Sequence, residues 1–592
     1  MKKTFSERSQ KALVLGVDDR SALTVTRSLG RRGVEVHLGI DQPYSIAQFS
    51  RYTRKVIRFP GAGRTPELWL EKLAEHLARE KYDLVIPTVD KYLVPVVQNR
   101  ARLEKLAKFA IPDERGFRYT YDKRQTLELA ESLGVPCPRS AEIHSPEGIE
   151  RVIAEFGFPL ILKPVSSKVW RDNLRYDLSV TLARDRAELG RKLPALLALC
   201  PVLIQTFHPG VGVGQEFLMK DGQALAVFQH ERVHEPQKGG GSSYRKSVEI
   251  DPLLLSHSLK LLQALNWTGV AMVEYKYDKS TGAAVFMEIN GRFWGSLPLA
   301  VAAGVDFPAW LFDMLVNDRL PQHVQYRKNL YVRNPVHDLD WLKENFRADK
   351  SNPFSLALPW RAVLGEAKNL LLFRERWDTI VWDDPQPGVR QLLSYLKKNL
   401  RGAADKLSRA LIHFDYKFNL PGRWLRQRRI AKLLRRNPAV AFVCKGNICR
   451  SPFAGIYLKS LSAKHNLNHI SGDSFGLIPR ENRRSPGLAL AAAESFGVDM
   501  SAHRSKMLTP ENAAVAGVIF VMDIDLYKQV KRLYPGARRK LFFLGALQPG
   551  RAGSIEIADP YGKTLEQFKS VFAQITRSVD QLLKLAKNQM VL

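Results

Sequence analysis

The sequence predicts a multidomain protein of the α/β class. Its 592 residues exceed one comfortable hydrophobic core and correspond to three or four domains of about 150 residues each. Short apolar strands alternate with amphipathic helices near both ends of the chain, and a strongly basic segment separates the two regions. With 45% hydrophobic and 25% charged residues the composition is that of a globular protein, which excludes a wholly disordered chain.

Residues 1–112 are predicted to form an α/β domain. Ala12–Gly16 and Val34–Leu38 have the composition of buried strands, with a helix over Ser21–Arg31 between them. Tyr82–Pro87 is a further apolar strand that ends at a proline. The βαβ order implies a parallel sheet with helices on both faces. No G-x-G-x-x-G follows the first strand, so a dinucleotide site is not supported.

Residues 113–335 contain short strands with charged residues within them, which is costly unless the charges meet a ligand. Lys123 begins an amphipathic helix, and Lys163 lies in a short apolar strand before a proline. Further on, Glu288 and Asn290 share one face of a strand, where they can bind a hard cation together with Glu274 from a neighbouring strand. Arg292 continues the same face toward a bound phosphate.

This ordered set, over about residues 1–335, resembles the ATP-grasp superfamily and is most similar to its carboxylate–amine ligase branch. The resemblance implies an ATP-grasp fold with a preceding α/β domain, ATP with Mg²⁺ or Mn²⁺ as cofactors, and the joining of a small carboxylate to an amine through an acyl phosphate. The alternative is a nucleotide-binding module without catalysis. Gly291, where related proteins often have proline or threonine, is a departure from the pattern.

Carried over onto this sequence, the resemblance implies a role for each of ten residues. The expected ligands of the nucleotide are Lys123 and Lys163 at the phosphates, the backbone of Gln205, Thr206 and Phe207 at the adenine, Glu216 at the ribose and Arg245 at the γ-phosphate or substrate. The expected metal ligands are Glu274, Glu288 and Asn290. A solvated helix start for Lys123 and a surface role for Glu216 are the competing interpretations.

Residues 336–436 are predicted to be a helical basic connector. Its last part, 397–436, holds thirteen lysine and arginine residues against two aspartates, interleaved with Phe414, Phe418, Trp424 and Leu425. This contributes about a third of the +31 net charge of the chain. A solvated linker whose apolar residues dock on a neighbouring domain and a helix on an anionic membrane are the two main interpretations. Nucleic-acid binding is less favoured, because no binding module accompanies the charge.

The final region, 437–592, begins with a buried strand followed by Cys444-Lys-Gly-Asn-Ile-Cys-Arg-Ser-Pro452 and a helix. A strand-to-helix junction presents free backbone N–H groups and the positive end of the helix to an anion. Such a site stabilises a thiolate at Cys444 and makes it a competent nucleophile. Arg450 can bind two phosphate oxygens, and Ser451 can donate a hydrogen bond to the thiolate.

This string resembles the low-molecular-weight protein tyrosine phosphatases, which place a general acid in a late Asp-Pro-Tyr loop, here Asp559–Tyr561. The resemblance implies a parallel α/β fold, a cysteinyl-phosphate intermediate at Cys444, Arg450 on the equatorial oxygens, Asp559 as acid and then base, and no cofactor. It further implies that Asn447 braces the loop and that Cys449 protects Cys444 through a reversible disulfide. An arsenate reductase shares this loop and is the alternative.

The expected location is the cytoplasm, with a peripheral position at the inner membrane face through residues 397–436. No run of about 18 apolar residues occurs, and the first apolar stretch is too short for a signal peptide. Four cysteines do not make a secreted disulfide framework. The expected partner is a phosphotyrosine protein, for which the family resemblance points to a bacterial tyrosine kinase of polysaccharide export.

Overall fold

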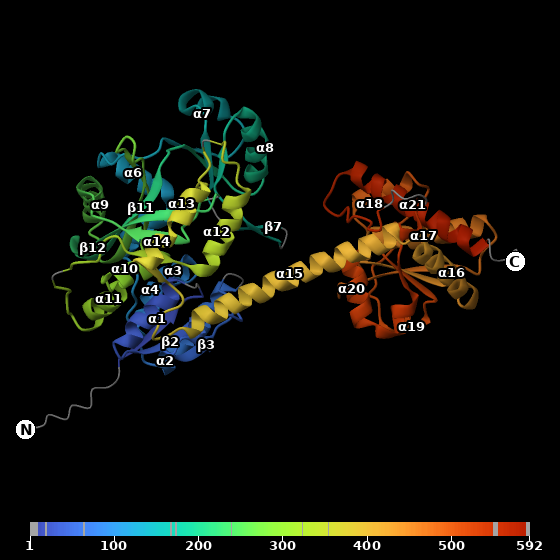
Figure 1. Ribbon diagram of the computed structural model, residues 1–592, viewed down its shortest axis with the longest axis horizontal. Coiled ribbons are helices and arrows are strands. Elements are labelled where there is room, and N and C mark those ends of the chain that lie inside the picture. The colour runs from blue at the N-terminus through green and yellow to red at the C-terminus, as the bar shows by residue number, and fades with distance from the viewer. Residues whose placement is uncertain are drawn as a thin grey trace, which may run out of the picture. The chain divides into compact units, whose positions relative to one another are not determined.

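The computed structural model describes residues 10–17, 20–62, 65–165, 168–171, 174–237, 239–322, 324–352, 354–548 and 554–587. The chain divides into two compact units, Met1–Lys397 and Lys398–Leu592, which are described separately (Figure 1). One helix, α15 (Gln386–Phe418), supplies residues to both.

The first unit starts with a four-stranded parallel sheet. Its strands are β1 (Lys11–Leu15), β2 (Glu35–Ile40), β3 (Thr53–Arg58) and β4 (Leu84–Pro87), in the order β3-β2-β1-β4. Ala12 and Val14 pack into one core, whereas Leu13 and Leu15 pack into another on the opposite face. This explains the continuous apolar run in the sequence, because a sheet buried on both faces needs apolar residues at every position.

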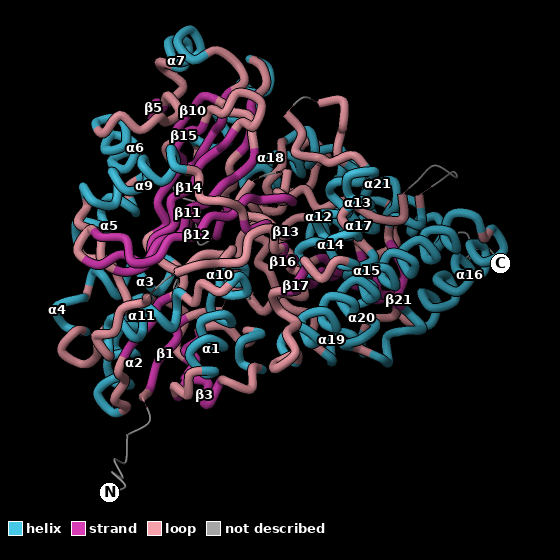
Figure 2. The backbone as a smooth tube through the Cα atoms, turned by 60° about the vertical axis from the view of Figure 1, so that its left-hand side comes forward, coloured by secondary structure: helices cyan, strands magenta, loops and turns pink. Residues whose placement is uncertain are grey.

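Two further sheets follow in the first unit, together with one short hairpin. The smaller is β5 (Ser140–Ile143), β10 (Val202–Thr206), β6 (Leu160–Pro164) and β9 (Thr181–Ala183), and the hairpin is β7 (Lys168–Arg171) and β8 (Leu174–Asp177). The larger is β15 (Ala284–Asn290), β14 (Gly269–Tyr277), β11 (Val211–Lys220), β12 (Gln223–His234), β13 (Tyr244–Ser247), β16 (Tyr331–Arg333) and β17 (Glu375–Trp377), in that order. Its long antiparallel strands β11, β12 and β14 lie side by side in Figure 2.

Helices connect and cover these sheets. They are α1 (Ser21–Arg31), α2 (Pro66–Arg79), α3 (Asp90–Gln98), α4 (Arg100–Leu103), α5 (Glu114–Tyr121), α6 (Lys123–Ser132), α7 (Ile149–Phe156), α8 (Arg186–Leu197), α9 (Pro252–Ala264), α10 (Leu297–Ala303), α11 (Phe307–Val316), α12 (Pro335–Arg347), α13 (Trp360–Gly365) and α14 (Ala367–Leu371). Among the helices in the described part of the chain, none is by itself long and apolar enough to cross a membrane. The pair α10 and α11, bent by 88°, satisfies length and composition only when taken together.

The stretch after residue 335 is held in the first unit by buried ion pairs. Arg245 Nη2 lies 2.9 Å from Asp378 Oδ2, and Arg27 Nε lies 2.9 Å from Asp384 Oδ2. His234 stacks on Trp341 with ring centroids 3.4 Å apart. The domain boundaries at residues 112, 335 and 436 stay predictions, but residues 338–384 contribute a strand and several buried partners to the first unit.

The second unit is built on a four-stranded parallel sheet. Its strands are β18 (Ala439–Cys444), β19 (Ser471–Gly476), β20 (Val518–Val521) and β21 (Leu541–Phe543), in the order β19-β18-β20-β21. Its helices are α16 (Leu420–Arg436), α17 (Arg450–Lys464), α18 (Gly487–Glu494), α19 (Pro510–Val515), α20 (Ile524–Leu533) and α21 (Leu565–Lys587). The predicted parallel sheet of the C-terminal region is therefore confirmed.

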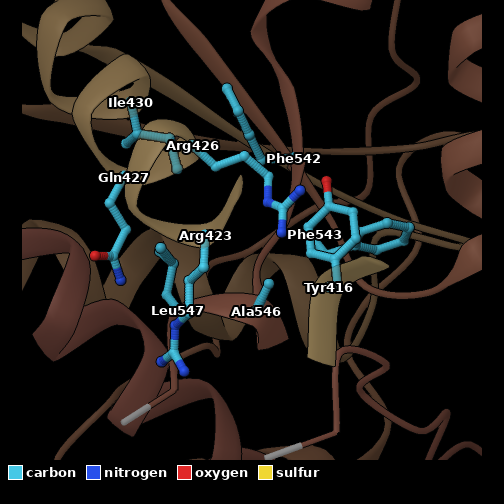
Figure 3. A pocket seen from close by; sticks show the side chains of 9 residues that line it. All are labelled: Tyr416, Arg423, Arg426, Gln427, Ile430, Phe542, Phe543, Ala546 and Leu547. Carbon is cyan, nitrogen blue, oxygen red and sulfur yellow. The ribbon is translucent and has the colours of Figure 1, made fainter. Parts of the chain in front are cut away.

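The basic helices α15 and α16 pack on this second unit through a small aromatic and arginine-lined pocket. Tyr416 from α15 lies edge-on to Phe543 of β21, with ring centroids 5.0 Å apart. Figure 3 shows Arg426 of α16 reaching over the ring of Tyr416, with its guanidinium carbon 4.1 Å from the centroid. Arg426 also pairs with Asp415 at 2.9 Å. One face of the connector thus docks on a neighbouring domain.

Candidate active sites

The predicted nucleophile lies at the junction between a strand and a helix. β18 ends at Cys444, α17 begins at Arg450, and the five residues between them form a loop. The sulfur of Cys444 accepts hydrogen bonds from the backbone N–H of Asn447 at 3.2 Å and from the hydroxyl of Ser451 at 3.0 Å. Both donors face the sulfur, and this arrangement stabilises the thiolate form.

Asn447 holds the loop in shape. Its φ of +52° is the left-handed conformation, which asparagine tolerates better than most residues. Its side-chain amide donates to Ser451 Oγ at 3.0 Å and to Ser474 Oγ at 2.9 Å, and its Oδ1 accepts from the backbone N–H of Lys506 at 2.8 Å. Burial lowers the pKa of His503, and Nε2 of its neutral ring donates to the carbonyl of Asn447 at 2.9 Å.

Arg450 is almost fully buried and is held by two carboxylates. Its Nη1 donates to Asp523 Oδ2 at 3.0 Å and to the carbonyl of Ile557 at 2.8 Å, and its Nη2 lies 3.0 Å from Asp559 Oδ2. Its Nε is a buried donor for which the described residues provide no acceptor. Buried donors are normally satisfied, so this N–H is available to an oxyanion in the loop.

The remaining predicted residues of this site lie around the same loop. Asp559 is half-exposed, and the following Tyr561 is exposed, as a group that meets substrate from solution must be. Cys449 is a buried thiol: burial, and then the charge of Cys444, raise its pKa to about 12. Both cysteines are free thiols in the structure.

A second cluster lies at one edge of the large sheet in the first unit. Glu274 on β14 pairs directly with Glu288 on β15, so their side chains emerge on the same face. Asn290 donates from Nδ2 to Glu274 Oε1 and to Glu288 Oε1, both at 3.2 Å. Two carboxylates and an amide therefore converge, as the period-two spacing predicts.

The two predicted lysines lie near this cluster. Lys163 Nζ lies 4.0 Å from Glu288 Oε2. Burial acts to raise the pKa of Glu288, but the charges of Lys163 and Lys123 outweigh it and lower the pKa. Burial, and then the charge of Lys163, lower the pKa of Lys123. The two ammonium groups thus face one carboxylate, and a pair of adjacent cations is suited to binding phosphates.

Two partners of this cluster were missed by the sequence analysis. Arg232 on β12 lies 2.5 Å from Glu274 Oε2, and burial is outweighed by Glu274 and Glu235, which raise the pKa of Arg232. Asp90, at the start of α3, forms a two-pronged pair with Arg292, with Nε–Oδ1 at 2.6 Å and Nη2–Oδ2 at 2.9 Å. Neither partner is adjacent in sequence, so no local spacing indicates them.

Gly291 has a packing explanation. A Cβ built at this position would lie 2.8 Å from the ring of Trp267, which is closer than real contacts allow. Any larger residue between Asn290 and Arg292 would displace the indole. The glycine that departs from the family pattern thus leaves the space that the ring of Trp267 fills in this chain.

The segment predicted to meet the adenine, Gln205–Phe207, contributes Thr206 and Phe207 to the lining of a pocket of about 300 Å³. The pocket is lined by Cys137, Arg139, Phe156, Phe158, Pro159, Thr206, Phe207 and His208. The side chain of Gln205 is buried and donates to Ser140 Oγ at 2.9 Å, and Gln205 itself is paired with β5 on one side and β6 on the other.

Two predicted nucleotide contacts differ in the structure. Glu216 is completely buried, accepts a hydrogen bond from Ser296 at 2.6 Å and lies 2.9 Å from His230, so its carboxylate is not open to a ribose. Arg245 is also completely buried and pairs with Asp378 and the carbonyl of Gly295. Both side chains make their polar contacts inside the protein, with Ser296 for Glu216 and Asp378 for Arg245, and these partners are distant in sequence.

Comparisons with known proteins give one family match in each of the two units of the chain. A model of the low molecular weight phosphotyrosine protein phosphatase family matches residues 439–591, and one described as "ATP-grasp in the biosynthetic pathway with Ter operon" matches residues 201–337. A probable low molecular weight protein-tyrosine-phosphatase, EpsP, of Ralstonia nicotianae is 31% identical over 24% of this chain and 90% of its own length. A protein-arginine-phosphatase of Geobacillus stearothermophilus is 28% identical over 24% of this chain and 92% of its own length.

Among solved structures, the biotin carboxylase domain of 2-oxoglutarate carboxylase from Hydrogenobacter thermophilus, crystallised with MgADP, ADP and bicarbonate, is similar to 54% of this chain and 73% of that chain. The identity is 16% and the TM-score 0.45, and a likeness at this level does not by itself assign a ligand. The two family matches confirm the predicted pairing of an ATP-grasp ligase-like domain with a phosphatase domain. Through its C-terminal region, the chain belongs to the low molecular weight phosphotyrosine protein phosphatase family.

Proposed function

We propose that the second unit hydrolyses protein phosphotyrosine with Cys444 as nucleophile. The sulfur attacks phosphorus while the bond from phosphorus to the phenolic oxygen breaks, and Asp559 gives its proton to that oxygen. Arg450 and the backbone N–H groups of the loop stabilise the charge that develops on the transferred phosphoryl oxygens. Asp559 then takes a proton from water, which attacks the phosphocysteine and releases phosphate.

The observation that carries this proposal is the double hydrogen bonding of Cys444 Sγ beside a buried guanidinium, whose Nε meets no acceptor among the residues that the structure describes. Ser451 and Asn447 keep the sulfur and the loop in place, and Cys449 is the partner for a protective disulfide. The experiment is hydrolysis of p-nitrophenyl phosphate by the full chain and its Cys444→Ser variant. The variant should lose turnover; hydrolysis by the variant at the wild-type rate would contradict the assignment.

The proposed substrate is a phosphotyrosine protein, and a bacterial tyrosine kinase of polysaccharide export is the proposed natural one. The name of the Geobacillus relative makes phosphoarginine a competing substrate, and the shared loop makes arsenate another. Parallel assays with phosphotyrosine peptide, phosphoarginine peptide and arsenate with a thiol reductant separate the three. Highest kcat/KM on phosphotyrosine supports the proposal, and highest turnover of either other substrate contradicts it.

For the first unit, we propose an ATP-dependent ligase that joins a small carboxylate to an amine. Lys123 and Lys163 would bind the nucleotide phosphates, the backbone of Gln205–Phe207 would meet the adenine, and Arg292 would bind the phosphate of the activated carboxylate. The pair between Arg292 and Asp90 holds this guanidinium at the cluster until substrate replaces the aspartate. Glu216 and Arg245 would stabilise the large sheet through their buried contacts with Ser296 and Asp378 and would not bind the nucleotide.

The residues present fit a magnesium ion. Glu274, Glu288 and Asn290 offer only oxygen ligands once the amide turns its oxygen inward, which is the set that Mg²⁺ or Mn²⁺ prefers. Within the part of the chain that the structure describes, no cluster of three His, Cys, Asp or Glu forms a closed metal cage. Magnesium sites at nucleotides use one or two carboxylates plus the phosphates. The two carboxylates of Glu274 and Glu288 are therefore the number expected for such a site. The ion would neutralise phosphate charge during transfer.

A nucleotide-binding module without catalysis is the alternative for this unit. The two are separated by measuring ADP release from ATP across a panel of carboxylates and amines on a Cys444→Ser background, which removes phosphatase turnover. Substrate-stimulated ADP release that Glu288→Gln abolishes supports a ligase. Binding of MgATP without stimulation by any pair supports the alternative.

The proposed organisation is an α/β domain over 1–112, the ATP-grasp domain over 113–335, a connector over 336–436 and the phosphatase domain over 437–592. The proposed location is the cytoplasm, peripheral at the inner membrane face. An anionic membrane is the proposed partner of residues 397–436, and small carboxylates and amines are the substrates of the ligase. Nucleic acid is not a proposed partner.

A further inference from the structure

The C-terminal part of α15 carries a row of large apolar side chains that face solvent. We call Leu400, Leu407, Leu411, Phe414 and Phe418 the outer stripe. Each of these five side chains is at least 60% exposed. At 100° per residue their spacings place all five within a sector of about 60° around the helix axis. The outer stripe is therefore a continuous apolar face and not a scatter of single exposed residues.

The opposite face of the same helix is the one that packs on the second unit. Ile412 packs against its core and Tyr416 against Phe543. His413 Nε2 lies 3.0 Å from Glu556 Oε2, and Arg409 pairs with Asp525. Helix α15 thus has two apolar faces, and docking on the second unit uses only one of them.

Positive charge borders the outer stripe. Lys406 and Lys417 lie about 90–110° from the middle of the stripe, both on the same side of it, and are exposed. Past the break at Asn419, α16 exposes Trp424 and Leu425, and the guanidinium carbon of Arg428 lies 3.7 Å from the ring centroid of Trp424. Over 397–436 thirteen basic residues face two acidic ones, and the acidic Asp405 and Asp415 are already paired with Lys528, Arg409 and Arg426.

We propose that the outer stripe is a membrane-binding face that inserts into the surface of an anionic lipid bilayer. A helix of this kind lies in the interface plane, with leucine and aromatic side chains among the acyl chains and lysines reaching up to the phosphates. Charge selects the occupant, because an excess of eleven positive charges attracts anionic lipid head groups. The inference deepens the proposed membrane partner and rests on it, but not on either catalytic activity.

Two other occupants fit less well. A second copy of this chain would bring the same basic segment, on a protein of net charge +31, against itself, and like charges oppose that association. Nucleic acid would satisfy the basic residues but would leave five exposed apolar side chains in water.

The experiment is co-sedimentation of the full chain with vesicles of phosphatidylcholine alone and with one third phosphatidylglycerol. The stripe variant is Leu407→Glu with Phe414→Glu. The matched control is Val515→Glu with Leu533→Glu, which adds the same two charges at exposed apolar positions of the same unit, at the ends of α19 and α20. Hydrolysis of p-nitrophenyl phosphate shows that each variant retains a folded second unit, and light scattering gives the mass of each protein in solution.

The expected result is binding of wild type and control to the anionic vesicles, at least about tenfold weaker partitioning of the stripe variant, and little binding to neutral vesicles. Equal partitioning of stripe variant and wild type would overturn the outer stripe while leaving the membrane partner standing. Failure of wild type to bind anionic vesicles would overturn both. A dimeric wild type that the stripe variant converts to a monomer would show that the face belongs to a second copy instead. Turnover of p-nitrophenyl phosphate reports separately on the phosphatase.

Discussion

The guanidinium of Arg450 lies 3.0 Å from a carboxylate oxygen of Asp559, although the two residues come from the start of a helix and from a distant loop. Asp523 binds the other terminal nitrogen of the same guanidinium at 3.0 Å. Phosphate binding and proton donation are thereby joined, because the group that binds the phosphoryl oxygens is in contact with the proposed acid. This relationship underlies the first two predictions.

Asp559→Asn should lower kcat for phenyl phosphate by roughly 10²–10⁴-fold, because the leaving phenolate loses its proton donor. The loss should be smaller for p-nitrophenyl phosphate, whose leaving group needs less protonation. Steady-state kinetics on the two substrates measure the difference. Equal losses on both would mean that Asp559 acts by positioning Arg450 and not as the acid.

Asp523→Asn should lower kcat/KM by about tenfold, because it removes the charged partner that orients the Arg450 fork. Asparagine can still cap α20, where Asp523 accepts from the N–H of Leu526 at 2.9 Å, so the fold should persist. The readout that separates positioning from folding is inhibition by phosphate, which should weaken in parallel. An unchanged inhibition constant would contradict a positioning role.

The rim of the phosphatase loop is basic and should favour acidic peptides. Arg483 Nη2 donates to the carbonyl of Gly446 at 2.6 Å and its Nε to the carbonyl of Arg480 at 3.2 Å, which holds this arginine-rich segment against the loop. Arg480→Glu should raise KM about three- to tenfold for a phosphotyrosine peptide with acidic neighbours. KM for p-nitrophenyl phosphate, which is too small to reach the rim, should not change. A rise for both substrates would locate the effect at the loop itself.

Fragments should show where the first unit ends. Residues 1–397 should unfold cooperatively, whereas residues 1–335 should not, because the shorter fragment loses Asp378 and Asp384, the carboxylate partners of the buried Arg245 and Arg27. Breaking a buried pair costs about 3–5 kcal/mol, and two such losses are comparable to the whole stability of a domain. Urea titration followed by tryptophan fluorescence tests this. A cooperative transition in the shorter fragment would show that residues 336–397 are a separate connector.

The pH dependence of the first unit should depend on His234. Burial acts to lower its pKa, but hydrogen bonds to Asp338 and Glu366 outweigh burial and raise the pKa above 6.5. A raised pKa contributes stability that is fully present below pH 6.5 and is lost as the pH rises through the folded value. Hydrogen exchange of peptides from β12 and β13, after correction for the intrinsic base-catalysed rise of exchange with pH, should therefore quicken as the pH rises through the folded pKa. His234→Gln should remove this trend, and an unchanged trend would assign it to another group.

Local pattern was sufficient to predict much of this protein. The strand before Cys444, the helix after it and the shared face of Glu288 and Asn290 follow from short spacings, and the structure brings these residues together as expected. Long-range pairing is what the sequence could not provide. Charged residues inside strands were predicted to face a ligand. The position of Lys163 agrees with this prediction, because its Nζ lies 4.0 Å from Glu288 Oε2 in the candidate nucleotide site.

For Glu216 and Arg245 that interpretation differs from the structure, because their partners Ser296 and Asp378 lie 80 and 133 residues away. The same limit explains why Arg232 and Asp90 were missed. Composition likewise indicated a helical basic connector over 336–436, but only packing could show which of the two apolar faces of α15 is buried.

The most direct test of the account is to identify the atom that receives the phosphoryl group. The full chain, mixed with p-nitrophenyl phosphate and quenched in acid within milliseconds, should carry one phosphate on the peptide that contains Cys444. Asp559→Asn, slowed in hydrolysis of the intermediate, should carry more of it, and Cys444→Ser should carry none. Turnover with no covalent phosphate, or phosphate on any other residue, would contradict the account.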